Sequence, residues 1–341
     1  MSTRYLVIAV ARIGDTLLAT PLMRSVKAAD PRARLTVLAH PKRTEVLEHL
    51  AFIDELGGID KGRSPWRGWF AGRRYEAAIV LGREVSLVRY ALRVARRVVA
   101  YDEPGFPESE RLTRVPTEPG THAVLDRLRL VQALGFAASG PRLAYRVSEA
   151  ERAGAQAQLA RRWPECTSER GLRIGLQMSS FPTKPHRDWP VGHFSALARE
   201  LSRDLPQARF VVLGDAHARR AAAPFMAEHG DRALLAAGET RLREAAALIA
   251  ELDLYIGVDT GPTHIAGALG VPMVALYHCL YPGRNLAPLD HPACRVIEHP
   301  LTGDERCAGH GMQDITVESV RDAALELLRA APVRANAGAL S

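Results

Sequence analysis

Three segments place polar side chains beside glycine or proline directly after an apolar run. The first, Arg12 to Thr16 (RIGDT), follows the run 5–11, and the second, Ser179 to Pro190, follows 173–177. The third, Gly257 to His264 (GVDTGPTH), ends the run 254–258. Because ligands of parallel α/β sheets gather at the carboxyl ends of strands, these segments are the candidate sites for chemistry.

Asp15 is the residue of the first segment that could act as an acid or a base. Arg12 and Gly14 precede it, and a glycine lets the backbone approach a ligand closely. Spacing alone favours a helix N-cap role for Asp15 over a carboxylate that faces a ligand. The segment is neither G-x-G-x-x-G nor a Walker A sequence, so it gives no support to a nicotinamide cofactor.

The second segment, SSFPTKPHRDWP, combines hydroxyl groups with Lys184 and Arg187. Hydroxyls and cations together supply the donors and the positive charge that phosphate oxygens accept. The alternative is a surface turn that Trp189 anchors to the core. The place of the segment at the carboxyl end of a strand favours anion binding.

The third segment is the most distinctive. A capping residue and a glycine follow the strand, and Pro262 opens a helix, so backbone N–H groups and the positive helix end would face a diphosphate. Asp259 could accept hydrogen bonds from sugar hydroxyls, and His264 lies within the first helical turn. Ordinary helix capping accounts for Thr260 and Pro262 but not for the whole cluster.

Apolar runs and segments with helical spacing alternate twice along the chain. This alternation predicts two doubly wound, Rossmann-like α/β domains. We predict an N-terminal domain over 1–150, a connector over 151–170, a C-terminal domain over 171–331 and a frayed tail over 332–341. The predicted strands are 5–11, 35–39, 77–81, 98–101, 173–177, 209–213, 254–258 and 272–277, and the predicted helices are 16–29, 44–50, 85–96, 122–134, 148–162, 191–204, 216–229, 242–251, 262–270 and 317–331.

Positive charge is concentrated in the first half of the 341-residue chain. Residues 1–163 carry 27 basic and 17 acidic residues, a net charge of +10, whereas residues 164–341 carry 18 and 21, a net charge of −3. Residues 61–97 hold ten basic residues with Trp66, Trp69 and Phe70 between them. This patch suits nucleic acid, an anionic membrane or a phosphorylated substrate, and a solvated arginine face is the alternative.

The four cysteines, Cys166, Cys279, Cys294 and Cys307, form no C-x-x-C pair and are few for a disulfide framework. Cys294 and Cys307 could ligate a metal with His291, His299 or His310, but the spacing matches no standard zinc pattern, and buried or loop thiols are favoured. We therefore expect a reducing cytoplasm. No apolar run approaches the length of a membrane span, and residues 5–11 indicate a buried strand, not a signal peptide.

The same segments resemble the heptosyltransferase family of bacterial lipopolysaccharide synthesis, glycosyltransferase family 9. The family's I-G-D and L-L-x-T-P patterns are matched by RIGDTLLATP, and its H-x-V-x-x-x-L-x-L-x-x-x-L-G pattern by HAVLDRLRLVQALG. W-P before a helix is matched by WPVGHF, and D-S/T-G-P-x-H by DTGPTH. Segments 240–253 and 268–277 match two more family patterns, so the resemblance covers residues 4 to about 330.

The resemblance implies a GT-B architecture, in which two domains face a central cleft, with the acceptor mainly on the N-terminal domain and ADP-heptose or a related nucleotide sugar on the C-terminal one. Asp15 would be the general base, with Arg12 and Gly14 in the loop near the acceptor. Arg187 falls where the family usually places a phosphate-binding lysine, and Lys184 is nearby. The implied donor-binding residues are Thr183, Lys184, Arg187, Thr240, Asp259, Thr260, Gly261, Pro262 and His264.

Two segments depart from the family. Ala218 stands where many members carry an acidic residue that holds the nucleoside, and YHCLYP at 277–282 replaces the usual aromatic-G-P-T-D-P. No D-x-D sequence occurs, so we expect no catalytic metal and no other cofactor.

The expected reaction is an inverting transfer to a glycan acceptor, anionic and lipid-linked, at the inner face of the inner membrane. The expected partners include an anionic membrane but not nucleic acid. The rival functions are a nucleotide-sugar epimerase, a GT-B transferase that modifies a soluble natural product, and a non-catalytic nucleotide-sugar-binding protein.

Overall fold

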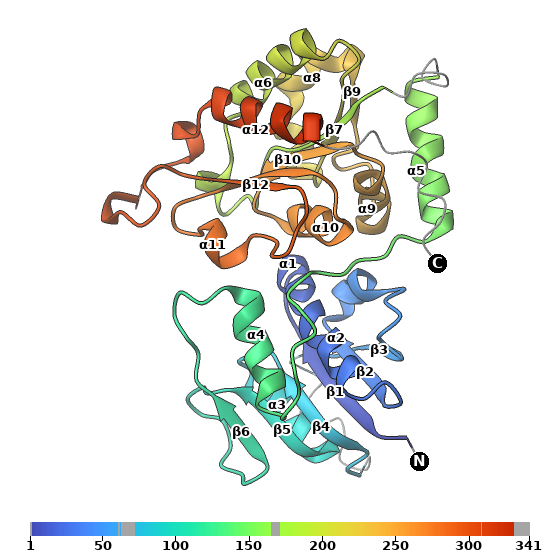
Figure 1. The fold of residues 1–341 in the computed structure, drawn as a ribbon, viewed down its shortest axis with the longest axis vertical. Helices are drawn as coiled ribbons and strands as arrows, with labels where there is room; N and C mark the ends of the chain where they lie inside the picture. The colour runs from blue at the N-terminus through green and yellow to red at the C-terminus, as the bar shows by residue number, and fades with distance from the viewer. Residues whose placement is uncertain (1, 61, 63–71, 165–170, 308, 331–341) are drawn as a thin grey trace. The chain divides into compact units, whose positions relative to one another are not determined.

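A computed structural model describes residues 2–60, 62, 72–164, 171–307 and 309–330 of the chain (Figure 1). The chain divides into two compact units, residues 1–146 and 147–341. Within the described ranges, each unit holds one six-stranded sheet in which all paired strands are parallel. The predicted class of two doubly wound α/β domains is confirmed.

The first unit has the strand order β3-β2-β1-β4-β5-β6. Helices α2 and α4 pack together, and the buried face of α3 packs against β1, β4 and β5. Its elements are β1 (Arg4–Ala9), α1 (Ile13–Leu17), α2 (Thr20–Ala29), β2 (Arg34–Ala39), η1 (Pro41–Leu47), β3 (Glu55–Gly58), β4 (Tyr75–Val80), α3 (Val85–Val94), β5 (Ala95–Tyr101), β6 (Leu112–Val115) and α4 (Ala123–Gln132).

The second unit repeats this order as β9-β8-β7-β10-β11-β12. Helices α6, α8 and α12 cover one face of the sheet (Figure 1). Helix α9 packs against both α5 and α10. Its elements are α5 (Glu149–Arg162), β7 (Arg173–Gln177), η3 (Pro185–Arg187), α6 (Val191–Asp204), β8 (Arg209–Leu213), α7 (Ala216–Ala221), α8 (Ala223–His229), η4 (Gly230–Arg232), β9 (Ala233–Leu235), α9 (Leu242–Ala250), β10 (Leu254–Val258), α10 (Gly261–Leu269), β11 (Met273–Tyr277), α11 (Gly283–Leu286), β12 (Cys294–Glu298), η5 (Glu305–Cys307), η6 (Met312–Asp314) and α12 (Val317–Ala330).

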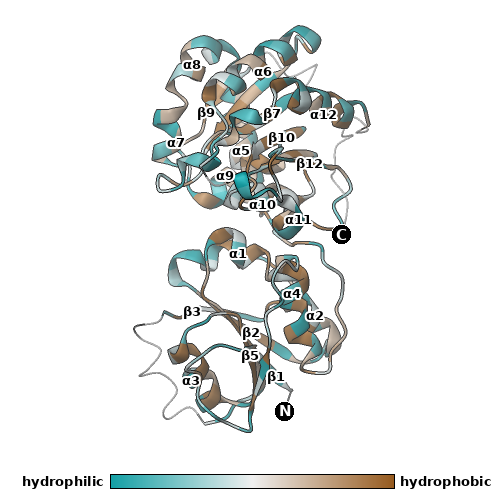
Figure 2. Cartoon of the chain, turned by 90° about the vertical axis from the view of Figure 1, so that its left-hand side faces the viewer, coloured by the Kyte–Doolittle hydropathy of each residue, from teal (hydrophilic) through white to brown (hydrophobic). Residues whose placement is uncertain are grey.

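The apolar runs become the central strands because both faces of these strands are covered. All residues of β10 and β11 are buried, and the cores consist mainly of aliphatic side chains from strands and inner helix faces. In Figure 2 the apolar colour follows the strands, whereas the helices carry both apolar and hydrophilic colours, as expected of helices with one buried face. No described helix has the length and apolar character needed to span a membrane.

Four predicted helices differ from the structure. The predicted helix 16–29 is two helices, α1 and α2, and α2 begins at Thr20 with Pro21 in its first turn, where the missing N–H costs little. The predicted helix 44–50 is the 3₁₀ helix η1, which begins at Pro41 with His40 as its N-cap. The predicted helix 85–96 ends at Val94, because Ala95 already begins β5. The predicted helix 216–229 is two helices, α7 and α8, and α8 begins at Ala223 with Pro224 in its first turn.

The strand order places the candidate segments. In both sheets the order reverses between the first and fourth strands of the unit, β1 and β4 or β7 and β10. At such a switch point the two outgoing chains diverge to opposite faces and leave a crevice for a ligand. Gly257 pairs with Gln177 in the register, so the segments that follow β7 and β10 leave the sheet side by side.

Candidate active site

Asp15 lies in the third position of α1 and is half-exposed, with 48% of its side chain accessible. Its predicted role as a helix N-cap is wrong, because the helix begins earlier and Arg12 occupies the N-cap position without a side-chain cap bond. Gly14 lies inside α1 and has no positive φ. Asp15 is therefore a carboxylate of the first helical turn at the switch point of the first sheet.

Arg127 holds the Asp15 carboxylate. Its Nη2 donates to Asp15 Oδ1 at 2.9 Å, and its Nη1 donates to the carbonyl of Ala123 at 2.8 Å. Arg127 is carried by α4, whose N-terminus is capped by His122 through a hydrogen bond from Val124 N–H to Nδ1. The bond to Oδ1 orients the carboxylate while Oδ2 keeps its lone pairs. Sequence reasoning missed Arg127, because no local motif connects residues 112 positions apart.

In the second unit, Arg187 and Asp259 meet at the switch point. Arg187 Nη2 donates to the Asp259 carbonyl at 2.6 Å and to Asp259 Oδ2, and both side chains are buried, with 9% and 7% exposed. His264 Nε2 lies 3.3 Å from Asp259 Oδ1. The three residues, which come from η3, the end of β10 and α10, form one buried group that connects the two candidate segments.

Tyr281 contacts both predicted phosphate-binding cations, Lys184 and Arg187. Lys184 Nζ donates to the Tyr281 hydroxyl at 3.0 Å and lies 4.5 Å from the ring centroid. The Arg187 guanidinium carbon lies 4.6 Å from the same centroid. Sequence reasoning did not assign Tyr281 a role, although it belongs to the segment that departs from the family pattern.

Of the remaining predicted donor residues, Thr260, Gly261 and Pro262 directly follow Asp259, whereas Thr183 and Thr240 lie in two other loops. Thr260 is the N-cap of α10, Gly261 and Pro262 form its first turn, and the helix directs its positive end toward the carboxyl edge of the sheet. Thr183 is exposed in the loop before η3. The Thr240 hydroxyl donates to the carbonyl of Ala236 at 3.2 Å, just before α9. Ala218 stands in α7, which Asp215 caps.

Several buried polar atoms at these strand ends have no hydrogen-bond partner. Buried polar groups in proteins are nearly always paired with protein, water or a ligand, so a cluster of unpaired ones indicates a polar ligand site. The Tyr277 hydroxyl is one of them, and burial raises the pKa of this side chain well above its usual value, so it stays protonated and can donate. Within the described part of the chain, the unpaired atoms here are Gln177 Oε1, Ser179 Oγ, Arg187 Nε, His264 Nδ1 and Tyr277 OH.

The prediction of buried or loop thiols is wrong for two of the four cysteines. Cys279 and Cys307 are not free thiols but form a disulfide, because the 277–281 segment and η5 bring their Cα atoms to 5.9 Å. The small number of cysteines therefore does not by itself indicate a reducing compartment. Cys294 is a free thiol, and burial raises its pKa to about 11. Cys166 lies outside the described residues.

The chain is similar to known proteins over almost its whole length. The chain is 26% identical to lipopolysaccharide heptosyltransferase 2 of Salmonella typhimurium over 363 aligned positions, which cover 95% of this chain and 98% of the relative. A family 9 glycosyltransferase structure from Veillonella parvula matches with a TM-score of 0.80 at 22% identity and covers 97% of this chain and 99% of that one. The structure of Escherichia coli ADP-heptose lipopolysaccharide heptosyltransferase II matches with a TM-score of 0.76 at 24% identity, over 96% and 99% of the two chains.

These two structures establish the GT-B fold of the chain. A sequence profile of glycosyltransferase family 9 (heptosyltransferase) matches residues 75–299, which include the Arg187–Asp259–His264 group but not Asp15. The profile spans well over half of the sequence, and the chain therefore belongs to glycosyltransferase family 9.

Proposed function

We propose that the protein transfers a heptose or a related sugar, with inversion, from a nucleotide-diphosphate sugar such as ADP-heptose to a hydroxyl of a lipopolysaccharide-type glycan. The observation that carries this proposal is the set of unpaired buried polar atoms beside Lys184 and Arg187 at the switch point of the second sheet. A diphosphate and a sugar supply the acceptors and donors that these atoms lack. The family names of the relatives point to the same substrates.

The leaving group determines what the second unit has to do. Negative charge develops on the diphosphate as the glycosidic bond breaks, and preorganised cations stabilise that charge without reorganising. Lys184, Arg187 and the N-terminal end of α10 would supply this stabilisation. The chain has no D-x-D sequence, so we assign the transfer step no metal and no organic cofactor.

The acceptor determines what the first unit has to do. A base must take the proton from the attacking hydroxyl, and Asp15 is an accessible carboxylate whose second oxygen is not engaged by Arg127. Arg12 and Gly14 precede Asp15 at the start of α1. Direct displacement by the hydroxyl inverts the anomeric carbon. We further propose that the enzyme works in the cytoplasm at the inner face of the inner membrane.

Replacing Lys184 with alanine should raise the dissociation constant for ADP by roughly 10- to 100-fold, because a charge-assisted contact to phosphate is worth about 1.5–3 kcal/mol. Isothermal titration calorimetry measures this change, and the difference should shrink in high salt because the lysine is only partly buried. Lys42→Ala, at an exposed position in η1, is the matched control. Equal ADP affinity in Lys184→Ala and the wild type would remove this lysine from the donor site.

The basic first unit should bind anionic vesicles at low salt and release them as salt increases, because its charges would pair with lipid phosphates. Changing Arg67, Arg73 and Arg74 to Glu should abolish co-sedimentation with anionic vesicles and leave ADP binding unchanged. Arg73 and Arg74 are exposed, whereas Arg67, Trp66, Trp69 and Phe70 lie outside the described residues.

The control for this experiment reverses exposed arginines of the second unit, Arg203, Arg220 and Arg329. Because the second unit does not carry the basic excess, this variant should still bind anionic vesicles. If the wild type ignores anionic vesicles at low salt, a soluble acceptor becomes the better assignment.

A further inference from the structure

Two cysteines and a histidine converge beside Tyr281, outside the group that would bind the donor. His278, Cys279 and Cys307, hereafter the His-Cys cluster, are buried, with 2%, 7% and 4% of each residue exposed. One potential ligand atom from each residue lies within 4.8 Å of the others. The disulfide joins the two sulfur atoms in this structure, and neither the proposed base nor the proposed phosphate-binding cations use them.

Two backbone partners determine which nitrogen of His278 carries its proton. Leu280 N–H donates to Nδ1 at 3.1 Å, so Nδ1 has the lone pair, and Nε2–H then donates to the His310 carbonyl at 2.8 Å. Histidines that ligate metals usually donate their other ring N–H to a carbonyl or carboxylate in this way. The Nδ1 atom is thus the ligand atom of this ring, and a metal would replace the Leu280 N–H as its partner.

The spacing of the ligand atoms suits one tetrahedral ion. His278 Nδ1 lies 3.8 Å from Cys279 Sγ. On a zinc ion with Zn–S of about 2.3 Å and Zn–N of about 2.0 Å, a sulfur and a nitrogen ligand lie about 3.5 Å apart. Once the disulfide is reduced, the two sulfurs need only side-chain rotation to separate to a similar distance. Two thiolates and one imidazole are a ligand set that thiophilic divalent cations prefer.

More imidazoles surround the His-Cys cluster. The His186 ring packs against His278 with a centroid distance of 5.0 Å, and the His299 ring lies 5.8 Å from His278 and 6.2 Å from His310. His299 is 1% exposed, and its Nε2 makes no hydrogen bond to the described residues, although Asp314 Oδ2 lies 3.3 Å away. His278 and His299 are buried whereas His310 is exposed, so two buried imidazole rings lie close together beside the cysteines.

We propose that His278, Cys279 and Cys307 form a binding site for a thiophilic divalent cation such as Zn²⁺ when the disulfide is reduced. A dithiol reductant supplies two electrons, the S–S bond breaks, two thiols form and the reductant becomes a cyclic disulfide. Each thiol then loses its proton to solvent as the metal–sulfur bond forms. The cluster is thus held together by a disulfide under oxidising conditions and by a metal under reducing ones.

The site would hold the donor-binding loops in place. Cys279 lies two residues before Tyr281, which contacts Lys184, and His186 directly precedes Arg187. The metal would therefore tie the 277–281 segment and η5 together beside η3. This consequence rests on the proposed function, whereas metal binding itself does not.

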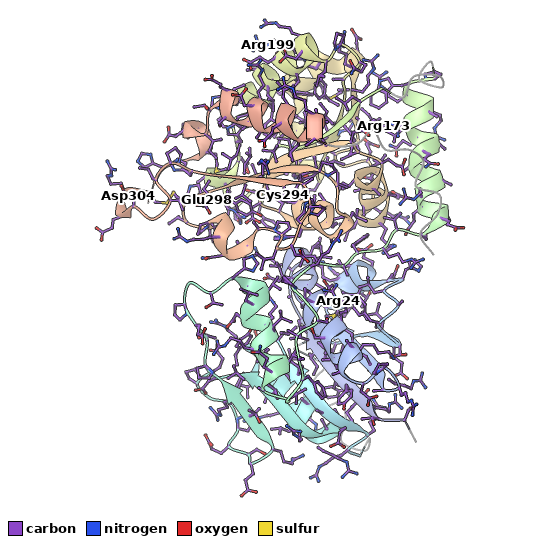
Figure 3. All side chains as sticks on the ribbon, in the orientation of Figure 1. Arg24, Arg173, Arg199, Cys294, Glu298 and Asp304 are labelled. Atoms are coloured by element: carbon purple, nitrogen blue, oxygen red, sulfur yellow. A yellow bond between two sulfur atoms is a disulfide. The ribbon has the colours of Figure 1, made fainter. Side chains whose placement is uncertain are left out.

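Metal content tests the site directly. The full chain, with any affinity tag removed, is purified with a dithiol reductant, dialysed against Zn²⁺ and then desalted, and its zinc is measured by mass spectrometry. We expect about one zinc per chain in the wild type and in the control Cys294→Ser, and almost none in Cys279→Ser, Cys307→Ser and His278→Ala. Cys294 is a suitable control because it is a free cysteine that does not belong to the His-Cys cluster. It begins β12, and the chain leaves this strand after Glu298 and passes Asp304 before it reaches Cys307 (Figure 3).

A second measurement needs no variant. Reduced wild-type protein loaded with Co²⁺ should show the thiolate-to-metal charge-transfer absorption of a tetrahedral site, and Zn²⁺ should displace it. A reduced, folded wild type that binds neither ion would overturn the proposal, as would equal zinc in the wild type and the cysteine variants.

ADP affinity then separates the two proposals. Chelating the zinc should weaken ADP binding several-fold if the site supports the donor loops. If the zinc-loaded protein binds no ADP at all, the proposed function fails, while the zinc content still supports the metal site.

Discussion

Replacing Asp15 with asparagine is expected to lower kcat by about 10²–10⁴-fold, the range typical of losing a general base. Asparagine has nearly the same shape and still accepts the hydrogen bond from Arg127, so the fold and the first helical turn should be preserved. The amide cannot take the proton of the acceptor hydroxyl. Affinity for ADP should change little, because we place the donor on the second unit. Steady-state turnover with a nucleotide sugar and a glycan acceptor measures the effect.

Asp30→Asn is the matched control. It makes the same chemical change in the same unit, but Asp30 ends α2 and precedes β2, at the opposite edge of the sheet from Asp15. Its kcat should stay within about twofold of the wild type, as for most surface changes. If Asp15→Asn retains comparable turnover, another group must take the proton.

The sequence predicts most of the central elements of both sheets and fewer of the edge elements. Strands β1, β4, β7, β8, β10 and β11 are recognisable because both faces are covered and their residues are almost all apolar. The sequence predicts no strand at β3, β6, β9 or β12, which are the four edge strands and are three to five residues long. Their hydrogen bonds depend on a neighbour that local sequence does not reveal.

The candidate site shows the same division. The positions of the segments after β1, β7 and β10 follow from the rule that ligands bind at strand ends, so sequence can predict where the site lies. The pairs within it cannot be predicted locally, because Arg127 contacts Asp15, Arg187 contacts Asp259 and Cys279 joins Cys307 across 112, 72 and 28 residues. Only the folded sheet order brings these partners together.

Replacing Arg187 with methionine should destabilise the second unit by about 3–5 kcal/mol, because removing one partner of a buried ion pair leaves the Asp259 carboxylate without compensation. The double variant Arg187→Met/Asp259→Leu should regain most of this loss, since an apolar pair can replace a buried ion pair at little cost. Hydrogen exchange of the β7 and β10 amides reports the stability of this unit alone. The control Arg295→Met breaks an exposed pair with Glu326, 46% and 58% exposed, and should leave the stability of the unit nearly unchanged, because solvent screens such a pair.

ADP binding separates structure from function: the double variant should be stable yet bind ADP at least as poorly as Lys184→Ala. A stable double variant with wild-type ADP affinity would show that Arg187 serves only to hold Asp259.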